Sequence, residues 1–440
     1  MRSKAVPALV LSANPVQLRP PPSLLPNAHR RCRGGICSRM LLGCCLLCLS
    51  QALPAATYTN PIIADGADPW VTYKDGYYYL TRTTGTGVYV RQASSLTGTN
   101  GIGAVAQVKI FTPPTPYNKE VWAPELHFIG GKGYIYYAAS DGTNANHRMF
   151  VAEQVGTSLS FTYKGKIYDS TTDCWAIDGT VLEAPNGALY FIWSGWPGAV
   201  DGLQNLYIAP MSNPWTISGP RVLLSTPTRT WESWIQEGPV VLQRNGKVFV
   251  VYAANLSWTD NECLGMLVNT NGNFLDPASW TKQSKAVFKT YSGPDGAVYG
   301  PGHCSLTQSL DGTEDWIFYH AAKTSGSGWD RNIRMQRFTW DANGYPSFGQ
   351  PVPEGVALNI PSGDAFTPAL LQPPTRPTNG AVQVTARAPL PLLTNNWALQ
   401  KSSDLKSWST LTNVPGLQFS ASASHSAAAS NTFYRVQSTR

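Results

Sequence analysis

The stretch Asp75-Gly76-Tyr77-Tyr78-Tyr79-Leu80 joins a tight-turn dipeptide to a run of aromatic and apolar residues. A glycine followed by such a run occurs five times, at intervals of 54 to 66 residues. The five stretches begin at Gly76, Gly133, Gly187, Gly246 and, with a longer lead into the run, Gly312. Asp-Gly, Asn-Gly and Gly-Gly at these points are strong β-hairpin signals. The sequence therefore predicts five hairpins of similar construction, which indicates a repeat architecture.

A further apolar run follows each predicted hairpin and supplies a third strand, as in Val88-Tyr89-Val90. An outer element with an aromatic residue usually comes next, as in Trp280-Thr281-Lys282. Five units of three or four strands predict an all-β fold with a five-bladed β-propeller, because radial packing leaves only short, protected sheet edges. A long β-sandwich is the alternative, but it does not account for five units of similar length.

The repeat also sets the predicted domain limits. Residues 57–363 hold the five units and form the propeller domain. Residues 364–380 read as a Pro-rich linker. Residues 381–440 contain short β-like runs, which predict a small C-terminal β-sandwich-like appendage. Carbohydrate binding, attachment to a cell surface and a purely structural role are all open for this appendage.

Residues 1–56 have the order of a signal peptide, with basic residues, the apolar run Leu41–Leu49 and then small residues. We therefore expect a secreted or periplasmic protein. No transmembrane segment is expected in the mature chain, because this run is shorter than the roughly 20 residues that span a bilayer. Met40 directly precedes the run and is an alternative start, and with that start residues 1–39 are not part of the protein. Cys44 lies near the beginning of the run rather than its end, which disfavours lipoprotein anchoring.

Charge and cysteine content exclude several classes of protein. The net charge is +7, but residues 1–56 carry seven basic side chains and no acidic one. The other residues hold 26 basic and 26 acidic side chains, so composition gives no argument for a nucleic-acid partner. Only Cys174, Cys263 and Cys304 lie outside the N-terminal segment, which allows at most one disulfide. A zinc site is not expected, because Cys and His show no paired spacing.

Counting back eight or nine residues from each turn glycine reaches an ionisable residue in every unit. These residues are Asp68, Glu125, Asp178, Glu237 and His303. Since the innermost strands of a propeller surround its channel, we expect these side chains to converge there. Buried carboxyl groups that repel one another have pKa values that are pushed apart. Glycosidic hydrolysis needs one carboxylic acid and one carboxylate, and a gap of about 6.5–9.5 Å between them admits a water and inverts the anomeric centre.

Several short stretches, in this order and spacing, resemble glycoside hydrolase family 43. This family contains five-bladed propeller enzymes that act on arabinans and xylans. The resemblance covers about residues 58–361. The matching stretches are Asn60-Pro61-Ile62, Gly66-Ala67-Asp68-Pro69-Trp70, Val121–His127, Ala176-Ile177-Asp178-Gly179, Gln236-Glu237-Gly238-Pro239, Tyr299–His303, Arg331–Trp340 and Gly344-Tyr345-Pro346.

The resemblance implies a role for five residues. Asp68 matches the general base that activates water, and Glu237 matches the general acid. Asp178 matches the third carboxylate, which orients the acid and raises its pKa. His303 matches a channel histidine that in relatives often lies beside a hydrated cation such as calcium, and Arg331 matches an arginine that binds the sugar to be cleaved. The implied chemistry requires no cofactor, whereas His303 makes a structural Ca²⁺ in the channel an expectation.

Three further residues are assigned to the substrate pocket. Counting alone leaves Glu125 open as the acid, but the resemblance puts it in a different motif, so it is interpreted as a pocket residue or one just behind the pocket. Trp70 and Trp122 either stack on a sugar face or belong to the propeller core. His127 and His320 are interpreted as structural.

The stretches Leu275–Trp280 and Glu314–His320, together with those around Glu237 and His303, are similar to the α-L-arabinofuranosidase branch of the family. This resemblance implies exo-acting, inverting release of L-arabinose, with an arabinan- or arabinoxylan-type polysaccharide or oligosaccharide as partner. β-Xylosidase and endo-arabinanase are the alternatives within the family. A non-catalytic sugar-binding propeller is the alternative outside it, but such a protein does not need three carboxyl groups.

Overall fold

The computed structural model describes residues 56–364, 370–371, 381–387, 397–402, 407–414, 420–426 and 433–438. The predicted signal segment up to residue 55 and almost all of the predicted linker lie outside these residues. The described residues form β-strands with only three short 3-10 helices, η1 (Asn144–Asn146), η2 (Thr230–Glu232) and η3 (Pro277–Ser279). In this part of the chain no helix is long and apolar enough to cross a membrane.

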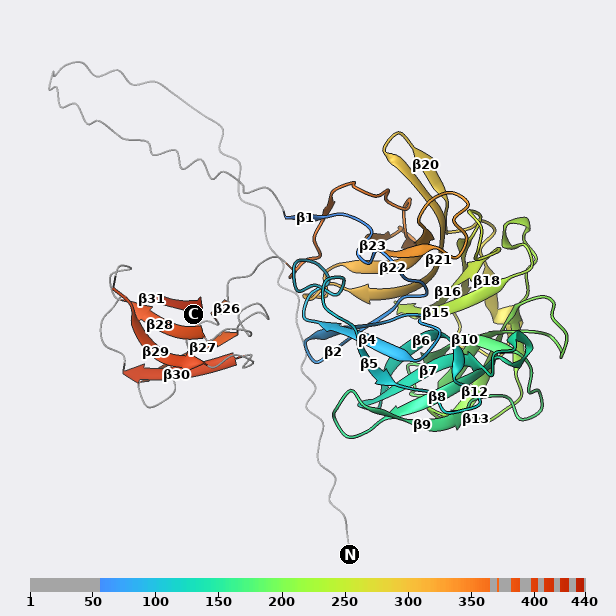
Figure 1. Ribbon diagram of the computed structural model, residues 1–440, viewed down its shortest axis with the longest axis horizontal. Helices are drawn as coiled ribbons and strands as arrows, with labels where there is room; N and C mark the ends of the chain where they lie inside the picture. The colour runs from blue at the N-terminus through green and yellow to red at the C-terminus, as the bar shows by residue number, and fades with distance from the viewer. Residues whose placement is uncertain are drawn as a thin grey trace, which may run out of the picture. The chain divides into compact units, whose positions relative to one another are not determined.

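Five antiparallel sheets follow one another along the chain as the blades of a propeller (Figure 1). The innermost strands of neighbouring blades contact one another, and the fifth contacts the first, so the ring is closed. These strands are β2 (Trp70–Lys74), β6 (Lys119–Ile129), β10 (Ala176–Glu183), β15 (Gln236–Arg244) and β21 (Gly296–Gln308). The predicted five-bladed β-propeller is therefore confirmed.

The other strands of each blade continue outward from the innermost one. The second strands are β3 (Tyr77–Thr81), β7 (Lys132–Ser140), β11 (Leu189–Gly195), β16 (Lys247–Ala254) and β22 (Asp315–Ala322). The third strands are β4 (Val88–Ala93), β8 (Arg148–Gln154), β12 (Asn205–Asn213), β17 (Cys263–Asn269) and β23 (Arg331–Trp340). The outer strands are β5 (Val108–Phe111), β9 (Phe161–Lys166), β13 (Thr216–Ile217), β14 (Val222–Ser225), β18 (Trp280–Lys282), β19 (Phe288–Lys289) and β24 (Pro346–Ser347), while β20 (Tyr291–Gly293) pairs with β21.

The predicted turn residues set the register of the hairpins. In the first blade both turn residues have positive φ, 51° at Asp75 and 89° at Gly76. In the fourth blade φ is also positive at both turn residues, 49° at Asn245 and 74° at Gly246. Positive φ at both central residues is the type I′ geometry, whose twist matches that of the flanking strands. Lys74 consequently pairs with Tyr77, with two residues between them.

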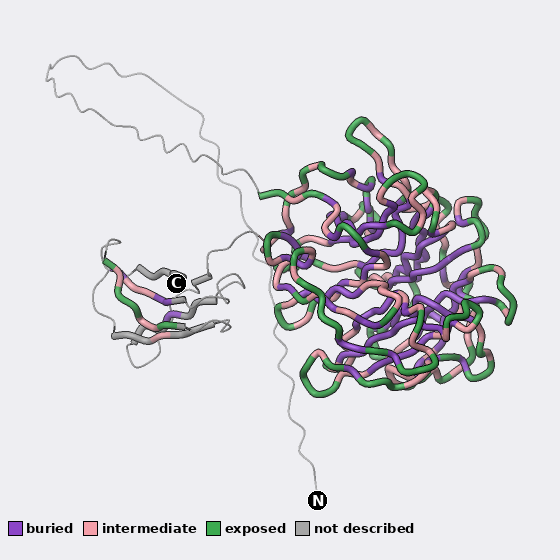
Figure 2. The backbone as a smooth tube through the Cα atoms, viewed as in Figure 1, coloured by how far each residue is buried: buried purple, intermediate pink, exposed green. Residues whose placement is uncertain are grey.

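Five apolar clusters hold the ring together, one at each interface between neighbouring blades. The cluster between blades five and one, for example, contains Leu80 and Phe318, which are 1% and 0% exposed. Burial follows the strands of every blade, while the connecting loops are exposed (Figure 2). Because both faces of a blade are covered, a strand such as β16 is a nearly continuous apolar run rather than an alternating one.

The N-terminal stretch closes the ring onto the fifth blade. The Asn60 side chain donates to Met335 O and accepts from Met335 N–H, both at 2.9 Å. Ile63 forms a bridge with Ile333 of the same strand. β1 (Thr57–Tyr58) then pairs with β25 (Leu358–Asn359), near the end of the propeller. The two ends of the repeat are thus joined by backbone pairing.

The three cysteines outside the N-terminal segment are free thiols. Cys263 and Cys304 are buried, and burial raises the pKa of both, that of Cys263 to about 12. Buried thiols with raised pKa values are unreactive. These two residues are therefore part of the packing.

A repeated backbone irregularity aims side chains into the channel. The innermost strands β6, β10, β15 and β21 each carry a register shift at a similar place. A residue with positive φ lies at each shift, namely Ala123, Asp178, Gly238 and His303, and Asp68 just before β2 has a φ of 55°. Bulges bend a strand and re-aim its side chains, and they are frequent beside active sites. The blades are therefore distorted at the place where the predicted site residues lie.

The C-terminal part contains two three-stranded antiparallel sheets. Contacts of β29 with β30 and of β26 with β31 bring the two sheets together, and Val384, Ala398 and Leu399 are buried. The sheets are β26 (Leu370–Leu371), β27 (Ala381–Arg387) and β30 (Ser420–Ser426), and β29 (Ser409–Val414), β28 (Trp397–Ser402) and β31 (Phe433–Ser438). This is the predicted β-sandwich-like appendage, whereas the predicted domain limits stay predictions.

Candidate active site

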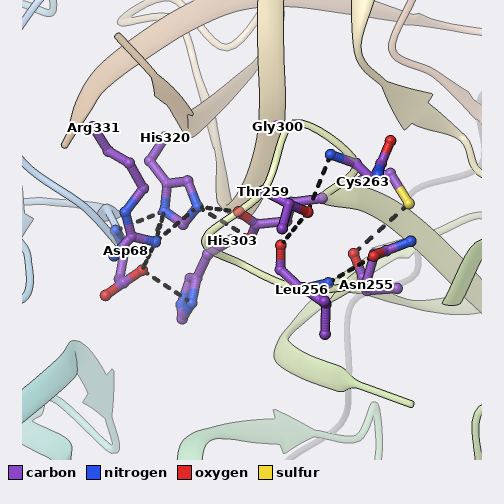
Figure 3. Close-up of polar contacts among 12 residues, drawn as sticks. Asp68, Asn255, Leu256, Thr259, Cys263, Gly300, His303, His320 and Arg331 are labelled. Atoms are coloured by element: carbon purple, nitrogen blue, oxygen red, sulfur yellow. Dashed lines mark hydrogen bonds and ion pairs between the residues drawn. The ribbon is translucent and has the colours of Figure 1, made fainter. Parts of the chain in front are cut away.

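Asp68 lies at the centre of a buried polar cluster, with Arg331, His320 and His303 around it (Figure 3). Its Oδ1 is 3.1 Å from His320 Nδ1, 3.5 Å from His303 Nδ1 and 3.6 Å from Arg331 Nη1. Its Oδ2 accepts a hydrogen bond from Thr83 Oγ1 at 2.5 Å. Burial alone raises the pKa of Asp68, but Arg331 and the two histidines outweigh burial and hold that pKa well below its usual value. Asp68 is therefore an ionised carboxylate.

Asp178 enters the same space from the third blade and is 5% exposed. Its Oδ2 accepts a hydrogen bond from Gly238 N–H at 3.1 Å and lies 3.7 Å from His303 Nδ1. Burial and the negative charges of Glu237 and Asp68 raise the pKa of Asp178 well above its usual value. His303, which lies near both aspartates, is neutral because burial lowers its pKa to about 4.

Glu237 is the second residue of β15 and is 9% exposed. Burial, followed by the negative charges of Glu262 and Asp68, raises its pKa to about 8. Glu237 is therefore a protonated carboxylic acid at neutral pH. The cluster thus holds a proton acceptor, Asp68, and a proton donor, Glu237, in opposite charge states at the same pH.

A further buried carboxyl group, Glu262, joins the cluster through His320. Glu262 is 1% exposed and directly precedes β17, and its two oxygens lie 3.0 and 2.9 Å from His320 Nε2. Burial lowers the pKa of His320, but Glu262 and Asp68 outweigh burial, so the pKa is raised overall. His320 was interpreted from sequence as structural. The structure instead places it between two carboxylates of the cluster.

Arg331 begins β23 and is 8% exposed. Its Nη1 lies 3.1 Å from His320 Nε2, in addition to its contact with Asp68. Its Nε is buried and has no hydrogen-bond partner among the described residues. Buried donors in native proteins nearly always have a partner, so a water molecule or a ligand is expected at this nitrogen.

Glu125, the fifth position that the count from the turn glycines picked out, has a different hydrogen-bonding partner from the other four. The bulge of β6 places Ala123 at positive φ, and Glu125 lies two residues further along the strand. Glu125 Oε2 is 2.7 Å from His127 Nε2. Burial raises the pKa of Glu125 well above its usual value and lowers that of His127 to about 3. Glu125 is therefore protonated and His127 neutral, whereas Asp68 is ionised.

Trp70 and Trp122 are half-buried and pack against the interblade clusters. Trp70 Nε1–H donates to Leu126 O at 2.8 Å, and the Trp70 ring stacks on His127 with centroids 4.5 Å apart. Trp122 stacks on His147 with centroids 3.8 Å apart. Packing within the propeller accounts for these contacts, and stacking on a sugar stays a prediction for both residues.

The expected calcium beside His303 was compared with the donor groups around it. His303 Nδ1 faces the carboxyl groups of Asp68 and Asp178. Across the described ranges, no three His, Cys, Asp or Glu side chains are grouped as ligands of one metal ion. Because Ca²⁺ takes six to eight oxygen ligands, these residues do not fit a calcium ion held directly by side chains.

Sequence reasoning missed Glu262, although a second count finds it. Glu262 directly precedes the third strand β17, and Arg331 is the first residue of the third strand β23. His147 and Gln204 directly precede the third strands β8 and β12. Third strands run in the same direction as innermost strands, so both begin at the same end of the propeller. A count at the start of the third strands, added to the count along the innermost strands, therefore finds Glu262 as well as Arg331.

A five-bladed propeller with an ionised carboxyl group beside protonated ones in its channel has the arrangement of an acid–base glycoside hydrolase. The family model of glycosyl hydrolases family 43 matches residues 58–346. The chain belongs to this family, in agreement with the resemblance seen in the sequence.

The relatives of this chain include α-L-arabinofuranosidases. The chain is 38% identical to an extracellular exo-α-(1→5)-L-arabinofuranosidase of Streptomyces avermitilis, over 70% of this chain and 66% of that protein. It is 36% identical to α-L-arabinofuranosidase 43 of Humicola insolens, over 72% of this chain and 69% of that protein. The crystal structure of an α-L-arabinofuranosidase from Lactobacillus brevis superposes with a TM-score of 0.63 at 35% identity, covering 68% of this chain and 98% of that one. The chain thus spans slightly less than two thirds of the Streptomyces relative.

Proposed function

We propose that this protein is an inverting, exo-acting α-L-arabinofuranosidase that releases L-arabinose from arabinan or arabino-oligosaccharides. The observation that carries the proposal is the coexistence of ionised Asp68 and protonated Glu237 in one channel. Glycoside hydrolysis needs these two states at the same pH. The printed names of the Streptomyces and Humicola relatives support the substrate, and that of the Streptomyces enzyme supports exo action.

In this proposal Asp68 is the general base. Thr83 holds one carboxylate oxygen and His320 lies against the other, so the group is fixed in orientation. Asp68 removes a proton from a water molecule while the water oxygen bonds to the anomeric carbon. The positive charge of Arg331 keeps Asp68 ionised before the reaction, so the base is available even in mildly acidic solution.

Glu237 is the general acid. It gives its proton to the glycosidic oxygen as the bond from that oxygen to the anomeric carbon breaks, so the remaining chain leaves as an alcohol. After one turnover Asp68 carries a proton and Glu237 has lost one, and exchange with solvent water restores both. With acid and base on opposite faces of the sugar, attack by water inverts the anomeric centre.

Asp178 positions the acid. Gly238, whose N–H donates to Asp178, is the residue next to Glu237 in β15. This hydrogen bond fixes the strand at the acid. Burial and the charges of Glu262 and Asp68 raise the pKa of Glu237, so Asp178, whose own pKa is raised, acts on the acid through its position rather than through its charge.

Glu262 and His320 act as positioning residues behind the base. His320 contacts Asp68 on one side and Glu262 on the other, which fixes the imidazole ring in the channel. Glu262 also raises the pKa of Glu237. One buried carboxylate therefore orients the base through an imidazole ring and keeps the acid protonated through its charge.

The direct test is the hydrolysis of linear α-1,5-arabinan by the protein and its Glu237→Gln variant. We expect arabinose as the first and main product, and a loss of about 10²- to 10⁴-fold in the variant, because it cannot donate the proton. Glu183→Gln, at the exposed end of β10, is the matched control and keeps full rate. Thermal unfolding of both variants shows that the fold is intact.

Other outcomes of this test and of two companion measurements contradict the proposal or indicate another function. Full activity of Glu237→Gln contradicts the assignment of the acid. Early release of mixed oligosaccharides indicates an endo-arabinanase, and preferential cleavage of nitrophenyl β-xyloside indicates a β-xylosidase. Tight binding of arabino-oligosaccharides in calorimetry without turnover indicates a non-catalytic propeller.

The proposal extends to the cation and to export. The steps above use only carboxyl groups and water, so we propose that the chemistry requires no cofactor and that any calcium beside His303 is structural and held through water. Unchanged melting temperature after treatment with a chelator contradicts such a calcium.

Export is supported by the order of residues 1–56 and by the extracellular relative. N-terminal sequencing of the protein from culture fluid tests it.

A further inference from the structure

Three tryptophan rings lie outside the apolar core and form a continuous line, here called the tryptophan arc. Trp234, Trp258 and Trp329 are 38%, 37% and 62% exposed. The ring centroids of Trp234 and Trp258 are 6.3 Å apart, and those of Trp258 and Trp329 are 5.5 Å apart. Exposed apolar groups that lie side by side mark binding surfaces, whereas scattered ones do not.

The arc leads to the catalytic cluster. The Arg331 guanidinium lies 5.1 Å from the centre of the Trp329 ring, and Arg331 also contacts Asp68. Trp234 stands three residues before Glu237 in the chain. Trp258 lies in the loop of residues 255–262 between β16 and β17, part of which Figure 3 shows beside His303 and His320. Each ring is therefore carried by a loop that also supplies or borders a residue of the cluster.

Polar contacts hold these loops in place. Asp260, two residues after Trp258, accepts hydrogen bonds from Ser325 Oγ and Gly326 N–H at 2.5 and 2.9 Å. It thereby ties the Trp258 loop to the loop that carries Trp329. Asp260 O also accepts from Gly300 N–H at 3.1 Å. A surface that is fixed before the ligand arrives loses less entropy on binding than a mobile one.

We propose that the tryptophan arc binds the arabinan chain that remains attached to the leaving oxygen. This inference rests on the proposed function. Glu237 gives its proton to the leaving oxygen, so the rest of the chain must depart past the fourth blade, where Trp234 and Trp258 lie. Sugar rings have apolar C–H faces that pack against aromatic rings, and their hydroxyl groups stay in water at an exposed site. The arc thus selects an extended oligosaccharide over a short one.

The test compares substrates of different chain length. For the purified protein and its Trp258→Ala variant, kcat/KM is measured on α-1,5-arabinobiose and on α-1,5-arabinohexaose. We expect the ratio of hexaose to biose to fall about tenfold in the variant, through a higher KM for the hexaose, which corresponds to a loss of about 1.4 kcal/mol of binding. Trp258→Phe keeps an aromatic face and restores most of the ratio.

Tyr163→Ala is the control, because Tyr163 is 42% exposed on the outer strand β9. It leaves the ratio unchanged. An unchanged ratio in Trp258→Ala, with both substrates still hydrolysed, overturns the inference and leaves the proposed function intact. Failure of the unmodified protein to hydrolyse either substrate instead contradicts the proposed function. Self-association of the protein that Trp258→Ala abolishes, with an unchanged ratio, assigns the arc to an interface between copies.

Discussion

Half-buried Asp68 and buried Glu125 occupy matching positions in adjacent blades, but their surroundings give them opposite charge states. Asp68 has Arg331 and two histidines around it, and its pKa lies well below its usual value. Glu125 has His127 as its hydrogen-bonding partner, and burial raises its pKa well above its usual value. Similar spacing from a turn glycine therefore does not imply similar chemistry. The neighbours that the fold supplies decide which carboxyl group can accept a proton.

The largest effect that this comparison predicts is that of Asp68→Asn. The substitution keeps the size of the side chain but removes the charge that accepts a proton from water. We expect kcat to fall by about a thousandfold or more, toward the upper end of the usual contribution of general base catalysis. Because water must be activated whatever the leaving group, the loss is the same for nitrophenyl arabinofuranoside and for arabinan. A much smaller loss on the nitrophenyl substrate contradicts the role of Asp68.

The next effect concerns pH. Glu237 must be protonated to act, so the rate falls as pH rises through its pKa of about 8. Asp68 must be ionised, and since its pKa is strongly lowered, the rate falls only in acidic solution. Glu262→Gln removes a negative charge near Glu237 and therefore lowers the pKa of the acid. We expect the alkaline limb of kcat/KM to move to lower pH by about one unit. An alkaline limb that does not move excludes Glu262 from this role.

The smallest effect is that of Glu125→Gln. Because Glu125 is protonated and therefore neutral in the folded protein, glutamine keeps the side chain neutral and keeps a hydrogen-bond donor to His127. We expect kcat/KM within about twofold of the unmodified protein, a difference of less than 0.5 kcal/mol. Glu125→Ala, which leaves the buried His127 without its partner, lowers the melting temperature. A large loss of activity in Glu125→Gln, with the melting temperature unchanged, means that Glu125 takes part in the chemistry.

The fold could be predicted from the sequence because its signals are local and repeated. Turn pairs such as Asp75-Gly76 determine the hairpins, and five repeats of similar length determine the ring. The closure through Asn60 and Met335 could not be predicted in the same way. It joins residues 275 positions apart in the chain and has no counterpart in the other blades.

The site was predictable only in part. Asp68, Asp178, Glu237 and His303 occupy repeated positions, and the structure brings them together. Glu262 and His320 do not lie on an innermost strand, so a count restricted to those strands cannot find them. The count also selects Glu125, but its charge state depends on its burial, which the spacing alone does not show.

The most direct test of the central claim is the anomeric form of the first sugar released, followed by NMR before mutarotation. The account places a water molecule between Asp68 and the anomeric carbon, so it predicts that an α-arabinofuranoside first yields β-arabinose. Initial release of α-arabinose means that a side chain attacks the sugar directly, which contradicts Asp68 as a base acting through water.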